Sequence, residues 1–532
     1  MRVRRLAVLA VLFPLIAVGL PAELTAHAAD LDHRRVDAVA TPILNWAPCE
    51  LGECARVLLP LDYDDPDGPT VEVALTRIPA RDPSRRLGSL FLNPGGPGAS
   101  GTDFPLRATA WLGADVQDRF DLIGMDPRGT NDSTRSHCFP TVRRLVEVAG
   151  PLLTLGFPVS ADEEDAFMAA AGELAHACSS RGRRLVGAMS TAEVARDLDV
   201  LRRAVGDDRL TFLGFSYGTY LGQVYANMFP DRVRALALDG VLDPTAWVGS
   251  AETAEEPMSL RLGSAQGASE ALAEGLRRCG DHPEACPLSD PAADFARLAE
   301  RLRRAPLRLE DPELGAYDLT YQQFITACLY ALYSDHGVEL VAGMTAALGA
   351  LAAEPSGLAT RRALAAQYRV QESAATRAAD RGDYPNFLEQ VPAVMCTDSR
   401  NPASMARWAE LADAADAAAP YFGRSWLWGS AYCAGDDWLV QDEDAYRGPF
   451  DRAGERPILV VGNHHDPATP YRAAVAVSRL LPNSRLLSSD NWGHTAYGVS
   501  ACSTAAVDAY LIDGRLPDEG TVCRDGHQPF EG

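Results

Sequence analysis

The 532-residue chain contains no lysine, so arginine carries all of its fixed positive charge. A P-loop nucleotide site needs a lysine beside the phosphates, and a pyridoxal phosphate enzyme needs one to form its Schiff base. Both classes of protein are therefore excluded.

Positive charge is also scarce relative to negative charge. The chain has 49 basic and 72 acidic residues, which gives a formal net charge of −23. Residues 1–28 carry three arginines and one glutamate, so without them 46 basic and 71 acidic residues remain, a net charge of −25. Such a chain repels nucleic acid and anionic membranes, and neither is expected as a partner.

Long apolar runs are absent apart from one near the N-terminus. Leu6 to Leu20 is apolar, follows an arginine-rich start and precedes an AxA cleavage motif at Ala26-His27-Ala28. This pattern predicts a secretory signal peptide over residues 1–28, and hence a secreted protein. A membrane anchor is the alternative, but the run is too short to span a bilayer.

Export would place the eleven cysteines in an oxidising compartment, where they can pair. Two pairs are close enough for local loops and three more are suggested by position: Cys49 with Cys54, Cys279 with Cys286, Cys138 with Cys178, Cys396 with Cys433, and Cys502 with Cys523. The sequence alone does not fix this connectivity. Cys328 lies in the apolar segment ITACLYALY and is the expected unpaired, buried thiol, because it lacks the His or Asn context of a catalytic cysteine.

The segment from Leu210 to Pro230, LTFLGFSYGTYLGQVYANMFP, places Ser216 between two glycines where a strand is expected to meet a helix. Gly214 and Gly218 fit a nucleophile elbow, because its strained turn brings strand and helix too close together for side chains. The turn would expose the serine hydroxyl and point the Tyr217 N–H at a developing oxyanion. A chance GxSxG is the alternative, but the flanking strand and helix favour catalysis.

A serine nucleophile needs a base and an orienting acid, which follow it in the order Asp, His in this architecture. The expected elements are a buried strand over Ile458–Val461 that ends at Gly462, a helix over Tyr471–Leu481 and a short strand over Ser484–Leu487. The loop after the first strand carries Asp466, and the loop after the second carries His494. This order predicts that both side chains lie at the same sheet edge as Ser216.

Two other histidines compete for the role of base. His464 and His465 directly precede Asp466 in the sequence, so we interpret them as surface or supporting residues. A metal site in this HHD segment is less favoured still, because adjacent histidines on a loop lack the usual ligand spacing.

A glycine-rich loop, NPGGPGAS, follows the apolar strand expected over Ser89–Asn93. The N–H of Gly96 is the candidate second oxyanion donor, and an ordinary Gly/Pro turn is the alternative. The next strand, in FDLIGMDPRGTNDS, ends in Asp126, Arg128 and Gly129. We interpret these three residues as an ion pair and turn that brace the loop rather than as substrate contacts.

The length exceeds what one hydrophobic core usually supports, so an inserted domain is expected. The α/β pattern covers residues 29–244 and resumes over residues 441–532. Between them, residues 245–440 are rich in Ala, Leu and Arg with helical periodicity. We interpret this insertion, whose return boundary is not sharp, as a helical cap over the site; a helical domain with no role there is the alternative.

These motifs resemble the α/β-hydrolase peptidases of the proline iminopeptidase and tripeptidyl aminopeptidase group, most closely the secreted actinobacterial tripeptidyl aminopeptidases. The motifs are NPGGPG, DPRGTNDS, GFSYGTYLG, LALDGVLDP, MCTDS at 395–399, DPATP and GHT, and the resemblance spans most of residues 40–525. Pro94 stands where the iminopeptidases have a histidine, which disfavours iminopeptidase specificity.

The resemblance implies an α/β-hydrolase fold, with a mostly parallel, doubly wound sheet and an inserted helical cap. It also implies release of short peptides, with tripeptides favoured, from free N-termini of peptides or proteins by Ser216, Asp466 and His494. The chemistry needs no cofactor and no metal. Acidic cap residues bind the substrate's ammonium group in the iminopeptidases. Asp398, in MCTDS, is the candidate here, and a turn or helix-capping role is its alternative.

Two other functions fit the same residues. A secreted esterase or lipase would use the same triad, and only the cap and the resemblance argue for peptides. A non-catalytic binding protein on this scaffold is disfavoured, because all three triad residues are present.

Overall fold

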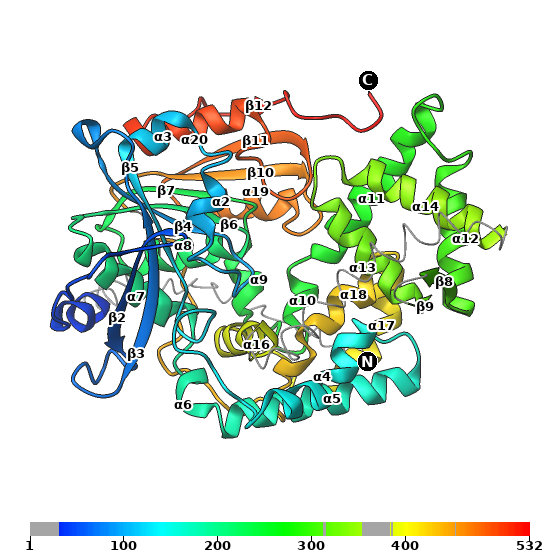
Figure 1. Cartoon of the computed structure of the whole chain (residues 1–532), viewed down its shortest axis with the longest axis horizontal. Helices are drawn as coiled ribbons and strands as arrows, with labels where there is room; N and C mark the ends of the chain where they lie inside the picture. The colour runs from blue at the N-terminus through cyan, green and yellow to red at the C-terminus, as the bar shows by residue number, and fades with distance from the viewer. Residues whose placement is uncertain (1–30, 312–314, 354–383, 385–386, 453, 532) are drawn as a thin grey trace, which may run out of the picture.

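The computed structural model describes residues 31–311, 315–353, 384, 387–452 and 454–531. The predicted signal peptide lies outside the described residues. A large sheet with helices on both faces forms one part of the molecule, and a helical part lies beside it and below it in the view of Figure 1.

The sheet has ten strands in the order β1-β2-β3-β5-β4-β6-β7-β10-β11-β12. The strands are β1 Ala47–Cys49, β2 Gly52–Pro60, β3 Thr70–Ile78, β4 Gly88–Asn93, β5 Phe120–Met125, β6 Leu210–Phe215, β7 Val233–Asp239, β10 Ile458–His465, β11 Ser484–Trp492 and β12 Val522–Cys523. β1, β2 and β3 pair antiparallel, and every pair from β5 to β12 is parallel. The mostly parallel α/β-hydrolase sheet is confirmed.

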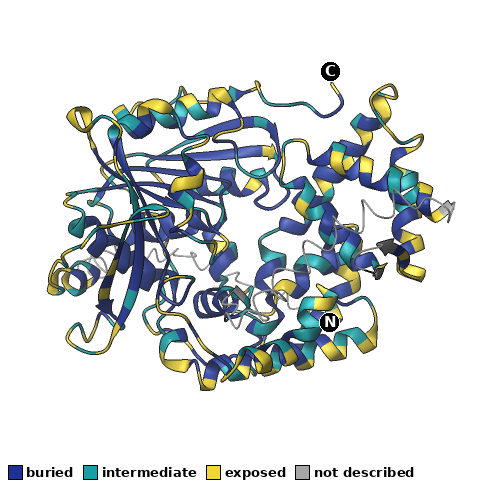
Figure 2. Cartoon of the chain, in the orientation of Figure 1, coloured by how far each residue is buried: buried dark blue, intermediate teal, exposed yellow. Residues whose placement is uncertain are grey.

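Helices cover both faces of this sheet, because alternate side chains of a strand point to opposite faces. Leu90 and Leu92 of β4 join one apolar cluster, whereas Phe91 joins another. The first face carries α2 Phe104–Ala108, α3 Ala114–Arg119 and α20 Ala501–Asp513; the second carries α7 Thr191–Ala204, α8 Tyr217–Met228 and α19 Tyr471–Leu480. The central strands are buried, and exposed residues gather on the outer sides of the helices (Figure 2).

The helical part has an apolar core of its own, which includes Phe295, Phe324 and Trp408. Its elements are α9 Pro244–Val248, α10 Met258–Arg261, α11 Ser264–Asp281, α12 Pro291–Arg304, β8 Leu307–Asp311, β9 Gly315–Leu319, α13 Tyr321–Leu332, α14 Gly337–Ala353, α16 Phe387–Asp398, α17 Ala406–Ala418, α18 Gly423–Leu427 and the 3-10 helix η2 Trp428–Cys433. β8 and β9 form a small antiparallel hairpin.

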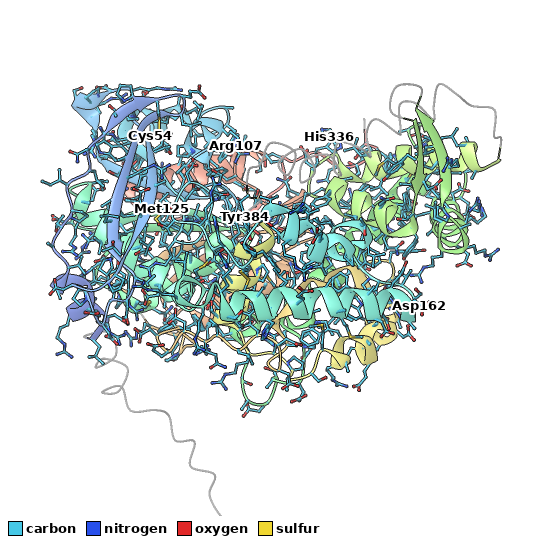
Figure 3. The ribbon with its side chains drawn as sticks, turned by 60° about the horizontal axis from the view of Figure 1, so that its bottom comes forward. Cys54, Arg107, Met125, Asp162, His336 and Tyr384 are labelled. Carbon is cyan, nitrogen blue, oxygen red and sulfur yellow. A yellow bond between two sulfur atoms is a disulfide. The ribbon has the colours of Figure 1, made fainter. Side chains whose placement is uncertain are left out.

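The helical part is not confined to residues 245–440. Between β5 and α7 the chain forms α4 Val142–Leu155, α5 Ala161–Ser180 and α6 Arg183–Val186. Phe157 and Phe167 of this excursion belong to the apolar core of the helical part, and the Phe167 ring lies 5.4 Å from the Trp428 ring. The long helix α5, marked by Asp162 near its start in Figure 3, packs on both parts of the chain, because its Leu174 and Cys178 join the apolar cluster at the sheet.

Two strands near the triad are longer than the sequence predicts. β10 does not end at Gly462 but continues to His465, and β11 continues past Leu487 to Trp492. The two strands pair along this extension. Gly462 does not break the strand: a Cβ there would lie 2.6 Å from the Cβ of Ala474, so the glycine lets α19 pack closely on the sheet.

All five predicted cysteine pairs are disulfides in the structure. They join Cys49 to Cys54, Cys138 to Cys178, Cys279 to Cys286, Cys396 to Cys433, and Cys502 to Cys523. Cys328 is unpaired and buried, as expected, and burial raises the pKa of its thiol far above the ordinary value.

The segment after β5 has the bracing role that the sequence predicts. Arg128 is fully buried and donates two hydrogen bonds to Asp197, at 2.8 and 2.6 Å, and one to Glu193 at 3.1 Å. Asp126 is also buried and accepts hydrogen bonds from the N–H groups of Gly101 and Thr102, just after the glycine-rich loop. The ion pair thus forms with α7, and Asp126 holds the loop.

Candidate active site

Ser216 occupies the tight turn between β6 and α8, with φ 55° and ψ −124°. A positive φ is strained for a serine and persists only where the surroundings impose it. Here the Ser216 N–H donates to the Asp239 carbonyl at 3.0 Å, and the Ser216 carbonyl accepts from the Thr219 N–H at 2.9 Å. The turn therefore has the conformation of a nucleophile elbow.

The glycines around the serine are required by close backbone contacts. A Cβ at Gly214 would lie 2.5 Å from the Gly218 carbonyl oxygen, and one at Gly218 would lie 2.8 Å from the Asn93 carbonyl oxygen. A Cβ at Gly95 would lie 2.4 Å from the Phe215 carbonyl oxygen. Strand β6, helix α8 and the loop after β4 can therefore meet only if these positions lack side chains.

Asp466 and His494 lie side by side, as the sequence predicts. The His494 Nδ1–H donates to both Asp466 carboxylate oxygens, at 3.0 and 2.9 Å. Asp466 also accepts from the N–H groups of Ala468 and Thr469 at 2.8 Å each, which fixes its orientation. His494 Nε2 is buried and has no hydrogen-bond partner among the described residues, so this nitrogen can accept a proton.

The charge of Asp466 sets the protonation of the imidazole. Burial of His494 lowers its pKa, but the negative charge and hydrogen bond of Asp466 raise it more, so the net shift is upward from the ordinary 6.5. An imidazole with a raised pKa is a stronger base. This is the environment in which a histidine takes a proton from a serine hydroxyl.

Ser216 and His494 open into one pocket with a volume of about 380 Å³. The pocket is mainly aromatic and apolar, and its lining residues are Pro94, Phe104, Trp111, Phe215, Ser216, Tyr333, His494, Thr495, Tyr497, Gly498 and Val499. Tyr333 comes from the helical part: its carbonyl accepts from the His494 N–H at 2.9 Å, and its ring lies 5.1 Å from the imidazole. The helical part therefore forms one wall of the pocket.

The loop after β4 lies against the elbow, where an oxyanion would form. The Gly95 N–H donates to the Asn93 side chain at 2.9 Å and is thus occupied. The Gly96 N–H remains the donor predicted from the sequence. Helix α16 secures the loop from the other side, because Gln390 Nε2 donates to the Gly98 carbonyl at 2.7 Å. Tyr217, the other candidate donor, begins α8.

Asp398 does not reach the pocket. It is fully buried at the end of α16, where its carboxylate accepts from the Thr191 N–H at 2.8 Å, the Thr191 hydroxyl at 2.6 Å and the Trp247 indole N–H at 3.1 Å. Burial raises its pKa to about 7, against the effect of these donors. The expected contact with a substrate ammonium group is wrong for this structure, because the carboxylate is enclosed by protein groups.

Asp398 instead supports the elbow indirectly, through Thr191. The Thr191 hydroxyl also lies 2.6 Å from the Tyr217 hydroxyl, so a chain of hydrogen bonds runs from α16 through α7 to the first residue of α8. No local pattern in MCTDS could reveal this role, because Thr191 and Trp247 lie 207 and 151 residues away from Asp398 in the sequence.

Two residues for which the sequence suggests no role hold the histidine loop. Asp239, fully buried at the end of β7, accepts from the N–H groups of Ala496 at 3.0 Å and Tyr497 at 2.7 Å, and burial raises its pKa to about 6. Asn463 of β10 donates to the Thr495 carbonyl at 2.7 Å. For both residues, a polar side chain at the end of an apolar strand is the sequence pattern that could have indicated a role at the site.

His464 and His465 do not compete with His494. His464 lies 3.3 Å from Asp490, and the His465 ring stacks on Trp492 at 4.0 Å. Burial lowers the pKa of His465 to about 4, so it is neutral in ordinary buffers. Neither side chain lines the pocket with Ser216.

Comparison with known proteins agrees with this geometry. A family model described as TAP-like protein matches residues 419–523, and one described as alpha/beta hydrolase fold matches residues 88–262. Serine protease Hip1 of Mycobacterium tuberculosis is 31% identical over 504 residues, which cover 90% of this chain and 91% of that protein. The chain belongs to the tripeptidyl aminopeptidase-like α/β hydrolases.

Other members of this family carry different names. A tripeptidyl aminopeptidase of Streptomyces lividans is 29% identical over 502 residues, covering 90% of this chain and 86% of that protein. A carboxylesterase B of Mycobacterium tuberculosis is 31% identical over 512 residues, covering 91% of each. Membership of the TAP-like α/β hydrolases makes this chain a serine hydrolase related to peptidases. In the part of the chain that the structure describes, no helix combines the length and apolarity needed to cross a bilayer.

Proposed function

We propose that this chain is a serine exopeptidase that releases short peptides, tripeptides above all, from the free N-termini of peptides or proteins outside the cell. The observation that carries the proposal is the placement of His494. Its Nδ1–H donates to Asp466, its Nε2 has no partner in the described part of the chain, and its side chain lines the same pocket as Ser216.

The proposed reaction is acyl transfer through a covalent intermediate. His494 Nε2 takes the proton of the Ser216 hydroxyl while Oγ attacks the scissile carbonyl carbon. The N–H groups of Gly96 and Tyr217 stabilise the oxyanion, and the imidazolium then gives its proton to the leaving amine. A water molecule, deprotonated by His494, attacks the acyl-enzyme and frees the peptide acid and Ser216.

Three observations support peptide N-termini as substrates. Relatives that match over most of their length are named tripeptidyl aminopeptidase and serine protease. The helical part contributes Tyr333 to the pocket wall, as expected of a cap that covers the site. The net charge of −23 attracts a cationic N-terminus. The lining residues of the described pocket include no carboxylate, so the ammonium group would be bound beyond them.

An esterase is the second candidate function. The pocket is lined largely by aromatic and apolar side chains, such as Phe104, Trp111 and Tyr497, which would also accept an apolar acyl group. A 31% identical relative is named carboxylesterase B. The same triad would hydrolyse an ester by the same steps.

A substrate panel separates the two functions. Tripeptide amides with a free N-terminus, the same amides with an acetylated N-terminus, and simple esters would be compared by kcat/KM, with Ser216→Ala as the control. We expect acetylation to lower kcat/KM by about one to three orders of magnitude, because it removes the charge of the amine. High salt should slow the free amide more than the acetylated one. Equal rates on free and acetylated amides would refute the exopeptidase, and turnover of esters alone would favour the esterase.

A further inference from the structure

A second group of potential ligand side chains lies outside the pocket, where the helical part meets the tail that follows β12. It consists of His336, directly before α14, Glu339 in the first turn of α14, and His527 in the tail. One ligand atom of each lies within 4.8 Å of the others, and the two imidazole rings are 3.8 Å apart. Figure 1 shows the tail running from β12 towards the helical part, and Figure 3 labels His336 on the side of that part that faces the sheet.

Only one of the two carboxylate oxygens of Glu339 has hydrogen-bond partners among the described residues. Its Oε1 accepts from His527 Nε2 at 2.5 Å and from the Phe530 N–H at 3.3 Å. Its Oε2 is buried and has no partner among the described residues. A buried carboxylate oxygen without a partner is costly, so this atom indicates a missing ligand. The side chains of Glu339 and His527 are 28% and 25% exposed, which leaves a path for an ion.

The donor set identifies the class of ion. Two imidazole nitrogens and one carboxylate oxygen are a ligand set that Zn²⁺ takes, at about 2.0–2.2 Å and with water as the fourth ligand. Ligand atoms around such an ion are roughly 3.4 Å apart, so the 2.5 Å contact between His527 Nε2 and Glu339 Oε1 has to open for the ion to enter. Two other acid-containing clusters include the disulfide partners Cys138 with Cys178 and Cys502 with Cys523, whose sulfurs are not available as thiolates.

We propose that His336, Glu339 and His527 bind one Zn²⁺ ion, and that the ion fastens the C-terminal tail to helix α14. The tail is already attached to the sheet, because Gln528 Nε2 donates to the Asp490 carbonyl of β11 at 2.9 Å. Tyr333, three residues before His336, contacts His494 through its carbonyl and its ring. The ion therefore fixes the helical wall of the pocket to the sheet that carries the triad. This site is independent of the substrate proposed above.

The test is calorimetric titration of the full, chelator-treated protein with ZnCl₂. We expect one Zn²⁺ per chain, an affinity at least tenfold lower in His336→Ala, Glu339→Gln and His527→Ala, and a rise in unfolding temperature of about 2–5 °C when Zn²⁺ is in large excess over Kd. His282→Ala is the matched control, since His282 lies 3.7 Å from Glu284 in the helical part but belongs to none of the clusters. This control should bind Zn²⁺ as the wild type does.

Two outcomes would overturn the proposal. One is wild-type protein that binds no Zn²⁺, and the other is binding that persists unchanged in His527→Ala. If binding persists there but disappears in His494→Ala, the ion belongs to the triad. Far-ultraviolet circular dichroism of each variant confirms that it is folded, so that lost binding reports lost ligands.

Discussion

Ser216 and Asp466 contribute to catalysis in different ways. Ser216→Ala removes the nucleophile and should abolish turnover while the fold persists, because the elbow is held by backbone contacts. Asp466→Asn should lower kcat by about a thousandfold or more, because an amide no longer fixes the Nδ1–H tautomer of His494. Steady-state kinetics measures both, and a serine-directed fluorophosphonate should label wild type at Ser216 alone. Appreciable activity in Ser216→Ala would refute the mechanism.

The raised pKa of His494 predicts how activity depends on pH. The base must be neutral to accept a proton, so kcat/KM should rise with pH as the imidazolium is lost. Because Asp466 raises the pKa above 6.5, the midpoint should lie above 6.5. The stability effect has the opposite sign: the stabilising His494–Asp466 interaction is complete below the unfolded pKa and is lost as pH rises through the folded one. A pH–rate profile with its midpoint at or below 6.5 would contradict this.

Asp398 allows a test that distinguishes support from substrate binding. Asp398→Ala leaves the donors of Thr191 and Trp247 unpaired, so the free energy of unfolding should fall by about 1–3 kcal/mol. Any loss of kcat/KM should be equal for free and acetylated tripeptide amides, because the carboxylate does not line the pocket. Denaturant unfolding and parallel kinetics measure the two effects. A loss confined to the free amide would restore the role in ammonium binding.

At the scale of elements, local motifs were predictable and distant contacts were not. The elbow around Ser216 follows from neighbouring glycines and could be predicted, as could the strand-acid-helix-strand-base order of Asp466 and His494. The hydrogen bonds that the Ala496 N–H donates to the Asp239 carboxylate join positions 257 residues apart, and no local pattern encodes them. The prediction that β10 ends at Gly462 was wrong, because the small size of this glycine allows helix packing and does not form a turn.

The bracing of β5 against α7 makes its own prediction. Arg128→Ala leaves the carboxylates of Asp197 and Glu193 buried and without their cation, so the free energy of unfolding should fall by about 3–5 kcal/mol. Arg304→Ala, which removes an exposed ion pair with Glu300, is the control and should cost about 1 kcal/mol or less. Urea unfolding of both variants measures the two losses of free energy. Equal costs would show that the buried network is not a stabilising brace.

At the scale of the whole molecule, the disulfides tie both parts of the chain. Reduction should lower the unfolding temperature. The bonds that close loops of 40 and 37 residues should each contribute about 2–4 kcal/mol to the free energy of unfolding, and the bond that closes five residues should contribute least. Thiol titration should find no reactive cysteine in the native protein and one, Cys328, after denaturation without reductant. More than one thiol would contradict the pairing.

The contact between Tyr333 and His494 bears on whether the helical part can be exchanged between relatives. The backbone N–H of His494 donates to a carbonyl supplied by the helical part, so that part adds one contact to those by which the sheet holds the base. Replacing the helical part with that of a relative should therefore preserve activity best when the new segment brings an equivalent carbonyl to the same place.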